Sequence, residues 1–499
     1  MPVAQAADRF PWLSAFAITG AALAFRLCQL SEEALFIDEY LTIRIAQVPG
    51  GAWGLVQYLW TTEPNPPLYF VFMRCWLDLF GSSAFALRLP SAIAGAGLAP
   101  VLMWTAWEAR KDVRIAVTAG ILTAINPFLF YYSQEGRVYL IQTLIIGVNL
   151  ALMTRLWNQR EQAVEKWLPA AIAASAALAI FSHYYSIFLL VLDLSIFGLL
   201  FLICISLEGW PNACQKFLHP AWSAPILSLA ALLFYALMAG SIAASRPGWA
   251  MQLPEWRPVF ILLQLRAIFY GPHWAVVPAW ALAIPLAAWI ALLINFRWHE
   301  RPAATIPALW GVFCLLALPH LVSIFHPILL GGQRYTVIAM PALILLTCIA
   351  LMHPRIRWLQ IVLLAALLLA PAPYYYSYFS HRQKRTWDTA AEICQQQLAE
   401  DNGEIWALSP FEIPLSYYLG ANREKLHLMR SYEEHPAPAA SSDMIILVAA
   451  KVKTAQSAIP PSCFHQEGSA ILLETHQPGN EIALMIFRRD TASVSEHQE

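Results

Sequence analysis

Two adjacent carboxylates, Asp38 and Glu39, follow the first long apolar stretch of the chain. Neighbouring carboxylates repel each other and lose hydration next to an apolar phase, so they need water, a cation or a chemical task. A carboxylate within hydrogen-bond reach of a hydroxyl or amine can take its proton as that group attacks another atom. The alternative is structural, with Asp38 capping a helix that starts at Tyr40 and Glu39 solvated.

A second acidic and basic pair, Glu135 and Arg137, lies between two long apolar stretches that almost no loop separates. Charged side chains at a membrane boundary are usually partnered and often functional. The pattern therefore permits two interpretations, a ligand site or a structural ion pair between the two residues.

Further basic and aromatic residues end or begin other apolar stretches. His183 and Tyr184 end one of them. Arg334 and Tyr335 open another, one residue after two glycines that let the backbone approach a ligand closely. Arginine can hold a phosphate through two parallel hydrogen bonds, and Arg266 is a further candidate for that task. The alternatives are an interfacial anchor for His183 and a snorkelling side chain for Arg334.

The composition of the chain indicates the kind of protein that must hold these residues in place. Of 499 residues, 59% are hydrophobic and only 13% are charged, and the mean hydropathy is +0.53. A soluble protein carries about a quarter charged residues, so the chain is predicted to be a membrane protein. A net charge of -1 gives no reason to expect a nucleic-acid partner. Charged residues are concentrated after Tyr374, which predicts a membrane domain over 1–373 and a soluble domain over 374–499.

Apolar stretches long enough to cross a bilayer predict a polytopic α-helical protein with about 11 (11–13) transmembrane helices. Shorter apolar stretches at 66–80 and 258–270 are interpreted as interfacial helices. The predicted spans are centred on 11–30, 87–107, 114–132, 138–157, 167–184, 186–206, 222–244, 274–296, 303–322, 334–352 and 356–372.

The positive charges predict how the chain is oriented in the membrane. Before Tyr374 the only lysines are Lys111, Lys166 and Lys216, and the predicted spans place all three on one side, which is expected to be the cytoplasm. The N-terminus is then cytoplasmic and the C-terminal domain periplasmic or otherwise extracytoplasmic, in a multi-pass protein of the cytoplasmic (inner) membrane. The predicted outer loops are 31–86, 133–137, 245–273 and 323–333.

The tail after the last span is predicted to be a small α/β domain. An amphipathic helix at 384–393 is followed by short apolar runs separated by turn-rich segments, at 404–408, 425–429, 444–449 and 482–487. Cys394 and Cys463 fall in this domain, where they either form a disulfide or remain free thiols. The domain is expected to recognise an acceptor or cover the active site, or to be purely structural.

Five motifs in this order resemble the bacterial family 39 glycosyltransferases, the relatives of protein mannosyltransferases and aminoarabinose transferases with the GT-C fold. The resemblance covers the membrane domain. The motifs are Asp38-Glu39, Pro66-Pro67-Leu68-Tyr69, the segment 85–91, the segment 133–139 and Arg334-Tyr335 with Pro341.

The resemblance implies transfer of a sugar from a polyprenyl-phosphate carrier to a lipid, glycan or protein acceptor outside the cytoplasmic membrane. Asp38 matches the family's catalytic base, with Glu39 beside it, and a single displacement would invert the anomeric configuration. Many relatives carry Asp-x-His where this chain has Glu63-Pro64-Asn65. The predicted substrate-binding residues are Asn65, Glu135, Arg137, Tyr139, His183, Tyr184, Arg266, Arg334 and Tyr335.

Relatives of this kind are regarded as working without an obligatory metal, so none is predicted; a divalent cation at Asp38, Glu39 or Glu135 is the alternative. Two other functions stay open. A secondary transporter would also have buried charges, of which Asp193 is the one mid-span candidate, but transporters show repeated halves and midplane charges. A membrane glycan polymerase or ligase would carry large arginine-rich outer loops late in the chain.

Overall fold

The computed structural model describes most of the membrane domain and the core of the C-terminal domain. Its described residues are 9–62, 65–160, 164–217, 229, 233, 236, 259–271, 282–295, 305–325, 333–351, 355–380, 386–408, 412–429, 442–449, 464–466, 471–473 and 482–489. The predicted span at 222–244 and the Gly331-Gly332 pair lie outside these residues, apart from the three single positions.

The chain divides into two compact units. Unit 1 comprises Met1–Leu30 and Ile45–Tyr375, and unit 2 comprises Ser31–Arg44 and Tyr376–Glu499. The segment that carries Asp38 and Glu39 therefore clusters with the C-terminal domain, and the boundaries fall inside two helices, α2 (Ile37–Ala46) and α19 (Ala372–Ser380).

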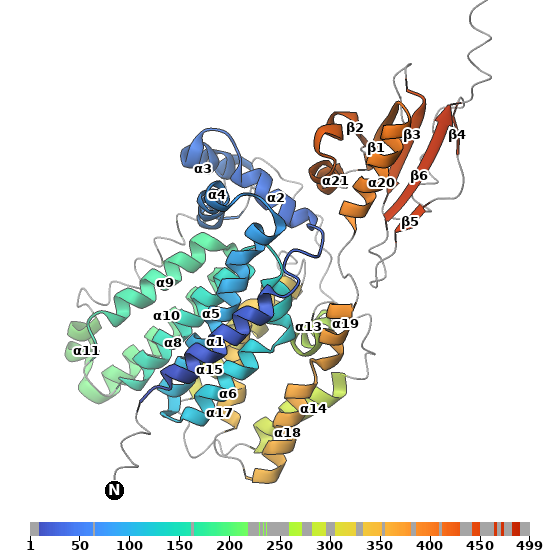
Figure 1. Cartoon of the computed structure of the whole chain (residues 1–499). Helices are drawn as coiled ribbons and strands as arrows, with labels where there is room; N and C mark the ends of the chain where they lie inside the picture. Colours follow the sequence, from blue (N-terminus) through green and yellow to red (C-terminus); the bar gives the residue numbers. More distant parts are fainter. Residues whose placement is uncertain are drawn as a thin grey trace, which may run out of the picture. The chain divides into compact units, whose positions relative to one another are not determined.

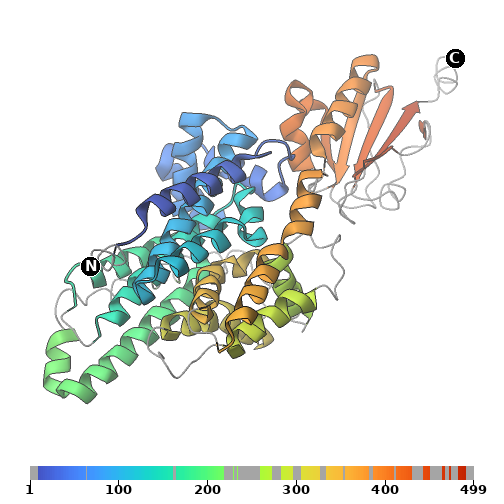
Figure 2. The ribbon, with the colours of Figure 1, turned by 60° about the horizontal axis from the view of Figure 1, so that its bottom comes forward.

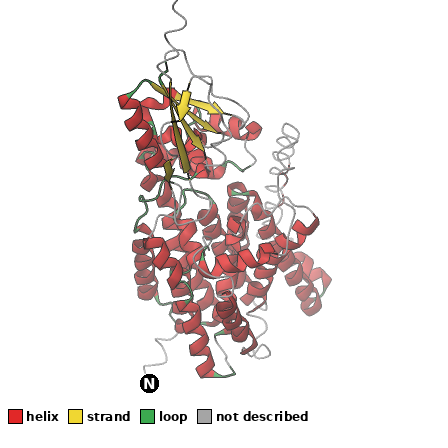
Figure 3. Cartoon of the chain, turned by 90° about the vertical axis from the view of Figure 1, so that its right-hand side faces the viewer, coloured by secondary structure: helices red, strands yellow, loops and turns green. Residues whose placement is uncertain are grey.

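Unit 1 is built from helices (Figure 1; Figure 3, red). They are α1 (Trp12–Leu27), α3 (Gly51–Thr62), α4 (Leu68–Phe80), α5 (Ala84–Arg110), α6 (Val113–Ala124), α7 (Pro127–Ser133), α8 (Tyr139–Asn158), α9 (Leu168–Ser182), η1 (Tyr184–Ser186), α10 (Ile187–Glu208), α11 (Trp210–Phe217), α13 (Val259–Tyr270), α14 (Ala283–Asn295), α15 (Ile306–Val312), the π-helix η7 (Phe313–Ala317), α16 (Leu318–Phe325), η9 (Gln333–Ala339), α17 (Met340–Ala350) and α18 (Arg357–Leu369).

Helix α5 is the centre of unit 1 and packs against α1, α6 and α8; these helices lie side by side in Figures 1 and 2. The Ser83 side chain caps its N-terminus by accepting from the Ala86 N–H, and Lys111 ends it in a left-handed conformation with φ 56°. The Asp112 carboxylate then accepts from the Arg114 N–H at 2.8 Å. The end of α5 at Lys111 and the cap of α6 at Asp112 are adjacent residues, which explains the tight connection between the two helices.

The predicted single span at 114–132 is broken, which corrects the sequence interpretation. Helices α6 and α7 meet at an angle of 53°. Pro127 has no N–H to continue α6, and the Asn126 side chain caps α7 by accepting from the Leu129 N–H at 3.0 Å. The Asn-Pro pair therefore ends one helix and starts the next.

The apolar helices agree with a multi-pass membrane protein. Among the described residues, 5 helices are long and apolar enough to cross a membrane, or up to 6 if the bent pair α6 and α7 is one span. Shorter apolar helices include α1, α9, α13 and α14. The predicted interfacial segments 66–80 and 258–270 form α4 and α13, which are 13 and 12 residues long. The total of about eleven spans stays a prediction.

Unit 2 contains a mixed β-sheet (Figure 3, yellow). Its strands are ordered β2-β1-β3-β6-β4, with β5 also paired to β6. Strand β1 is parallel to β2 and β3, whereas β6 is antiparallel to β3, β4 and β5. The strands are β1 (Gly403–Leu408), β2 (Leu426–Met429), β3 (Met444–Ala449), β4 (Phe464–Gln466), β5 (Ile471–Leu473) and β6 (Ile482–Arg489).

Two helices contribute to the core of this domain. Apolar residues of α20 (Trp387–Glu400) and α21 (Glu412–Tyr418) share one buried cluster with one face of the sheet. A second buried cluster, which includes Met485 and Phe487, covers the other face. The predicted small α/β domain is confirmed. Cys394 is a free, buried thiol, and Cys463 lies outside the described residues.

Candidate active site

The short segment between α7 and α8 carries Glu135 and Arg137 and is held from two other helices. The Tyr69 hydroxyl on α4 donates to the Gly136 carbonyl at 2.8 Å, and the Ser91 hydroxyl on α5 donates to the Arg137 carbonyl at 3.0 Å. The Arg137 N–H donates to the Glu135 carbonyl at 2.8 Å. This tight turn fixes a buried carboxylate and a half-buried guanidinium group next to each other in the chain.

Gly136 gives the first testable prediction, because a side chain there has no room. A Cβ atom at Gly136 would lie 2.4 Å from Leu87 Cγ. We expect Gly136→Ala to destabilise the protein by about 1–3 kcal/mol through overpacking, measured by thermal unfolding in detergent. Gly97→Ala is the control, because its Cβ would lie 3.8 Å from the nearest atom within helix α5. An equal loss in both variants would contradict the packing argument, and adding Leu87→Ala should restore part of the stability of Gly136→Ala.

A buried arginine, Arg26 on α1, supports this segment and was missed at the sequence level. Its Nε donates to Ser133 Oγ at 3.0 Å, and its Nη atoms donate to the Ala124 and Thr123 carbonyls at 3.1 and 3.2 Å. Those carbonyls lie at the end of α6, where the break leaves them without helical partners. In return, Gln134 Nε2 donates to the Arg26 carbonyl at 2.6 Å. The sequence does contain a signal for this role, because Arg26 is a charged residue inside the first apolar stretch.

Several predicted site residues come together as a cluster of rings. The His183 ring stacks on Tyr184 with centroids 4.4 Å apart and lies 5.5 Å from the Tyr335 ring. Tyr139 lies 6.0 Å from His183 and 6.2 Å from Tyr335. Tyr139 and His183 are buried, whereas Tyr335 is half-buried. Residues from α8, η1 and η9, far apart in the chain, thus form one aromatic surface.

Two arginines complete this group, which we call the aromatic–arginine cluster (Arg137, Tyr139, His183, Tyr184, Arg334 and Tyr335). The Arg334 guanidinium carbon lies 5.4 Å from the Tyr335 ring centroid. Arg137 and Arg334 both act electrostatically on the His183 ring, so the imidazole lies within the field of two positive charges. His183 Nδ1 accepts from the Tyr185 N–H at 3.2 Å, which leaves the proton of the neutral ring on Nε2. Two guanidinium groups beside a buried hydrogen-bond donor suit a phosphate.

The other predicted site residues have different surroundings. Glu135 acts electrostatically on Tyr131 and Tyr132, and Tyr132 lies 5.4 Å from Tyr139, ring to ring. Arg266 is buried on α13 and interacts with Tyr270 one turn later. Asn65 is half-buried just before α4, and Glu63 lies outside the described residues.

Asp38 and Glu39 lie in the first turn of α2 but differ in their surroundings. The Glu39 carboxylate accepts from the Phe36 N–H at 2.9 Å and the residue is 0% exposed, whereas Asp38 is half-buried. The structural alternative is wrong in two details, because the helix begins at Ile37 rather than Tyr40 and Glu39 is buried rather than solvated. Glu39 is bound to the Phe36 N–H, and Asp38 is the more accessible carboxylate of the two.

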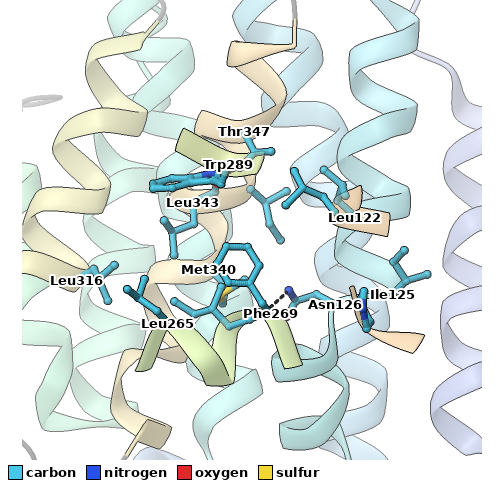
Figure 4. A pocket seen from close by; sticks show the side chains of 14 residues that line it. Leu122, Ile125, Asn126, Leu265, Phe269, Trp289, Leu316, Met340, Leu343 and Thr347 are labelled. Atoms are coloured by element: carbon cyan, nitrogen blue, oxygen red, sulfur yellow. Dashed lines mark hydrogen bonds between the residues drawn. The ribbon is translucent and has the colours of Figure 1, made fainter. Parts of the chain in front are cut away.

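An apolar cavity of about 120 Å³ lies among α6, α13, α14, η7, α17 and α18 (Figure 4). Its polar groups bond to other protein atoms: Trp289 Nε1 donates to Thr347 Oγ1 at 2.9 Å, and Asn126 Nδ2 donates to the Ile268 carbonyl at 3.1 Å. Leu265, Met340 and Leu343 are among the apolar residues of its wall. The cavity offers a surface suited to hydrocarbon.

The mid-span acid Asp193 is a hydrogen-bonded core residue. Asn149 Nδ2 donates to Asp193 Oδ2 at 3.1 Å and to Ser175 Oγ at 3.1 Å, which links α8, α9 and α10. Within the described part of the chain, no group of three or more His, Cys, Asp or Glu residues is arranged to hold a metal ion.

The comparisons with known proteins agree with this arrangement of helices. Residues 64–216 match the family model described as dolichyl-phosphate-mannose-protein mannosyltransferase. A search of curated proteins finds no match. The crystal structure of ArnT from Cupriavidus metallidurans in the apo state aligns with a TM-score of 0.57 and 15% identity, covering 95% of this chain and 97% of that one.

The structure of the same ArnT bound to undecaprenyl phosphate aligns with a TM-score of 0.55 and 14% identity, covering 95% of this chain and 98% of that one. The alignments span both the helical domain and the C-terminal domain. The chain therefore shares the fold of this ArnT, and the family-model match over residues 64–216 agrees with the resemblance predicted from the sequence.

Proposed function

We propose that the protein transfers a sugar from a polyprenyl-phosphate donor to a lipid, glycan or protein acceptor, with inversion at the anomeric carbon. The observation that carries the proposal is the aromatic–arginine cluster, in which Arg334 lies 5.4 Å from the Tyr335 ring and that ring lies 5.5 Å from the buried His183 ring. The family model is described by a prenyl-phosphate sugar donor, and the structurally similar ArnT was crystallised with undecaprenyl phosphate.

In this proposal the aromatic–arginine cluster binds the phosphate of the donor. When the bond from the anomeric carbon to the phosphate oxygen breaks, the electron pair stays on the phosphate and its negative charge grows. Arg137 and Arg334 stabilise that charge, and fixed cationic donors do so without rearranging during the reaction. The half-buried Tyr335 and its neighbour Tyr184 supply ring faces for a sugar.

Asp38 is proposed as the general base. The acceptor hydroxyl or amine attacks the anomeric carbon from the face opposite the phosphate, which forms the new glycosidic bond, and its proton passes to the Asp38 carboxylate. Glu39 holds the first turn of α2 through its bond to Phe36. Glu135, Asn65 and Arg266 are proposed as further substrate-binding residues.

The donor's prenyl chain needs an apolar surface, and part of it would fit the cavity next to Trp289 and Met340. No metal is required in this proposal; a divalent cation held by Asp38, Glu39 or Glu135 is the alternative, and activity that is lost in EDTA and restored by Mg²⁺ or Mn²⁺ would favour it. We place the protein in the inner membrane, with the N-terminus cytoplasmic and the C-terminal domain periplasmic.

The test uses purified full-length protein in lipid nanodiscs. It is given undecaprenyl phosphate carrying mannose, glucose or aminoarabinose, with candidate lipid, glycan and peptide acceptors. We expect release of undecaprenyl phosphate that depends on the acceptor, with formation of an inverted glycoside. If proteoliposomes instead show ion-coupled solute uptake and no donor is consumed, the protein is a transporter and the proposal is wrong.

A further inference from the structure

The helix that carries Asp38 is bound to a helix of the C-terminal domain almost 400 residues later in the chain. The Leu35 N–H donates to the Tyr418 hydroxyl oxygen at 2.7 Å. The hydroxyl groups of Tyr40 and Ser416 are 3.1 Å apart and share a hydrogen bond. The Tyr40 ring meets Tyr417 edge to face at 5.9 Å. These contacts explain why Ser31–Arg44 clusters with the C-terminal unit.

Helix α21 is itself firmly anchored in its domain. Leu415 of the helix and Leu419, the residue that follows it, both belong to the buried core cluster. Gln395 Nε2 on α20 donates to the Tyr418 and Leu419 carbonyls, both at 3.1 Å. Those carbonyls lie at the end of α21, where helical partners run out. The side chains of Ser416, Tyr417 and Tyr418 therefore project from a fixed support.

The two hydrogen bonds are made by residues on either side of the proposed base in the sequence. Leu35 precedes Asp38 by three residues and Tyr40 follows it by two, and both are buried, at 1% and 8% exposure. Asp38 between them is half-buried. The attachments on both sides therefore limit how far the backbone at Asp38 can move relative to the C-terminal domain.

We propose that the C-terminal domain positions the catalytic base, with Ser416, Tyr417 and Tyr418 as positioning residues that act through α2. The inference rests on the proposed role of Asp38. In this role the C-terminal domain contributes to the chemical step without supplying a catalytic group from α20, α21 or the sheet. Misplacing a reacting group by about 1 Å can cost on the order of 10²-fold in rate, so a smaller displacement of Asp38 after the loss of one hydrogen bond at α21 is expected to lower the rate several-fold.

Tyr418→Phe is the sharpest test, because it removes the hydroxyl that binds Leu35 and keeps the ring in its place. We expect kcat to fall about fivefold, the equivalent of roughly one neutral hydrogen bond, with the KM for the prenyl-phosphate donor unchanged. Ser416→Ala and Tyr40→Phe each remove the other hydrogen bond, so the double variant should lose no more activity than either single variant.

The matched control is Phe487→Leu, which changes the second buried cluster of the same domain and none of the residues of α21. It should lower the unfolding temperature at least as much as Tyr418→Phe does, yet leave kcat unchanged. If Phe487→Leu lowers kcat in proportion to its loss of stability, or if Tyr418→Phe keeps full kcat, the positioning role is refuted.

Hydrogen exchange separates this proposal from the proposed function. Amides of residues 35–42 should be protected in the wild type and exchange faster in Tyr418→Phe, a result that needs no substrate. Loss of protection together with unchanged kcat would overturn the positioning role and leave the transferase intact. Absence of any transfer by the wild type would instead refute the proposed function.

Discussion

Asp38→Asn is expected to lower kcat for sugar transfer by about 10²- to 10⁴-fold, the usual contribution of a general base. The amide has nearly the shape of the carboxylate but cannot take the acceptor's proton. The KM for the donor should change little, because the base acts on the acceptor. The measurement is the initial rate of undecaprenyl phosphate release at saturating donor.

Asp78→Asn is the matched control for this experiment. Asp78 belongs to α4, within the same predicted outer loop, and is 3.9 Å from Arg74 in an exposed pair with 67% of the aspartate side chain accessible. Its replacement should leave the rate unchanged, because exposed ion pairs contribute little. Full activity of Asp38→Asn would remove Asp38 from the mechanism.

Arg334→Ala should lower kcat by about 10²- to 10³-fold, the loss seen when one fixed donor to a developing negative charge is removed. Arg334→Lys should recover only part of the rate, since an ammonium group cannot form the paired hydrogen bonds of a guanidinium group. The ratio of the kcat values of the two variants therefore reports how much of the effect comes from the positive charge and how much from the paired hydrogen bonds.

The control for Arg334 is Arg357→Ala. Arg357 is the exposed first residue of α18 and should be dispensable for transfer. Binding of a labelled prenyl phosphate to each variant provides the second measurement. If Arg334→Ala binds and transfers as the wild type does, the phosphate is held elsewhere and the aromatic–arginine cluster loses its proposed role.

Much of the cluster could be anticipated from the sequence because its members stand at the ends of apolar stretches. That rule selects Glu135, Arg137, His183 and Arg334, and in the structure Arg137 and Arg334 both act electrostatically on the His183 ring. Hydropathy indicates where a span ends, and the ends of membrane spans lie at one of the two faces of the bilayer. The ring-to-ring packing of Tyr335 with Tyr185 at 4.8 Å has no such signal, since it depends on how η1 and η9 pack.

Other features are missed for three different reasons: a local signal that hydropathy overrides, strands that are very short, and contacts between distant segments. The sequence treats 114–132 as one apolar span, although Asn126 and Pro127 contain the signal for a break. The strands β4 and β5 are three residues each, too short for alternation to be recognised. The contact of Leu35 with Tyr418 joins segments that only the folded chain brings together.

The buried thiol of Cys394 provides a way to observe the C-terminal domain separately from the rest of the chain. Burial raises the pKa of this thiol to about 12, so at neutral pH it is not the thiolate that reacts with maleimides and iodoacetamide. Cys28 and Cys75 are exposed, and these two and the other five cysteines outside position 394 would be replaced by serine or alanine. In that background, the alkylation rate of Cys394 reports how often the domain opens in a native membrane, with no need to purify it.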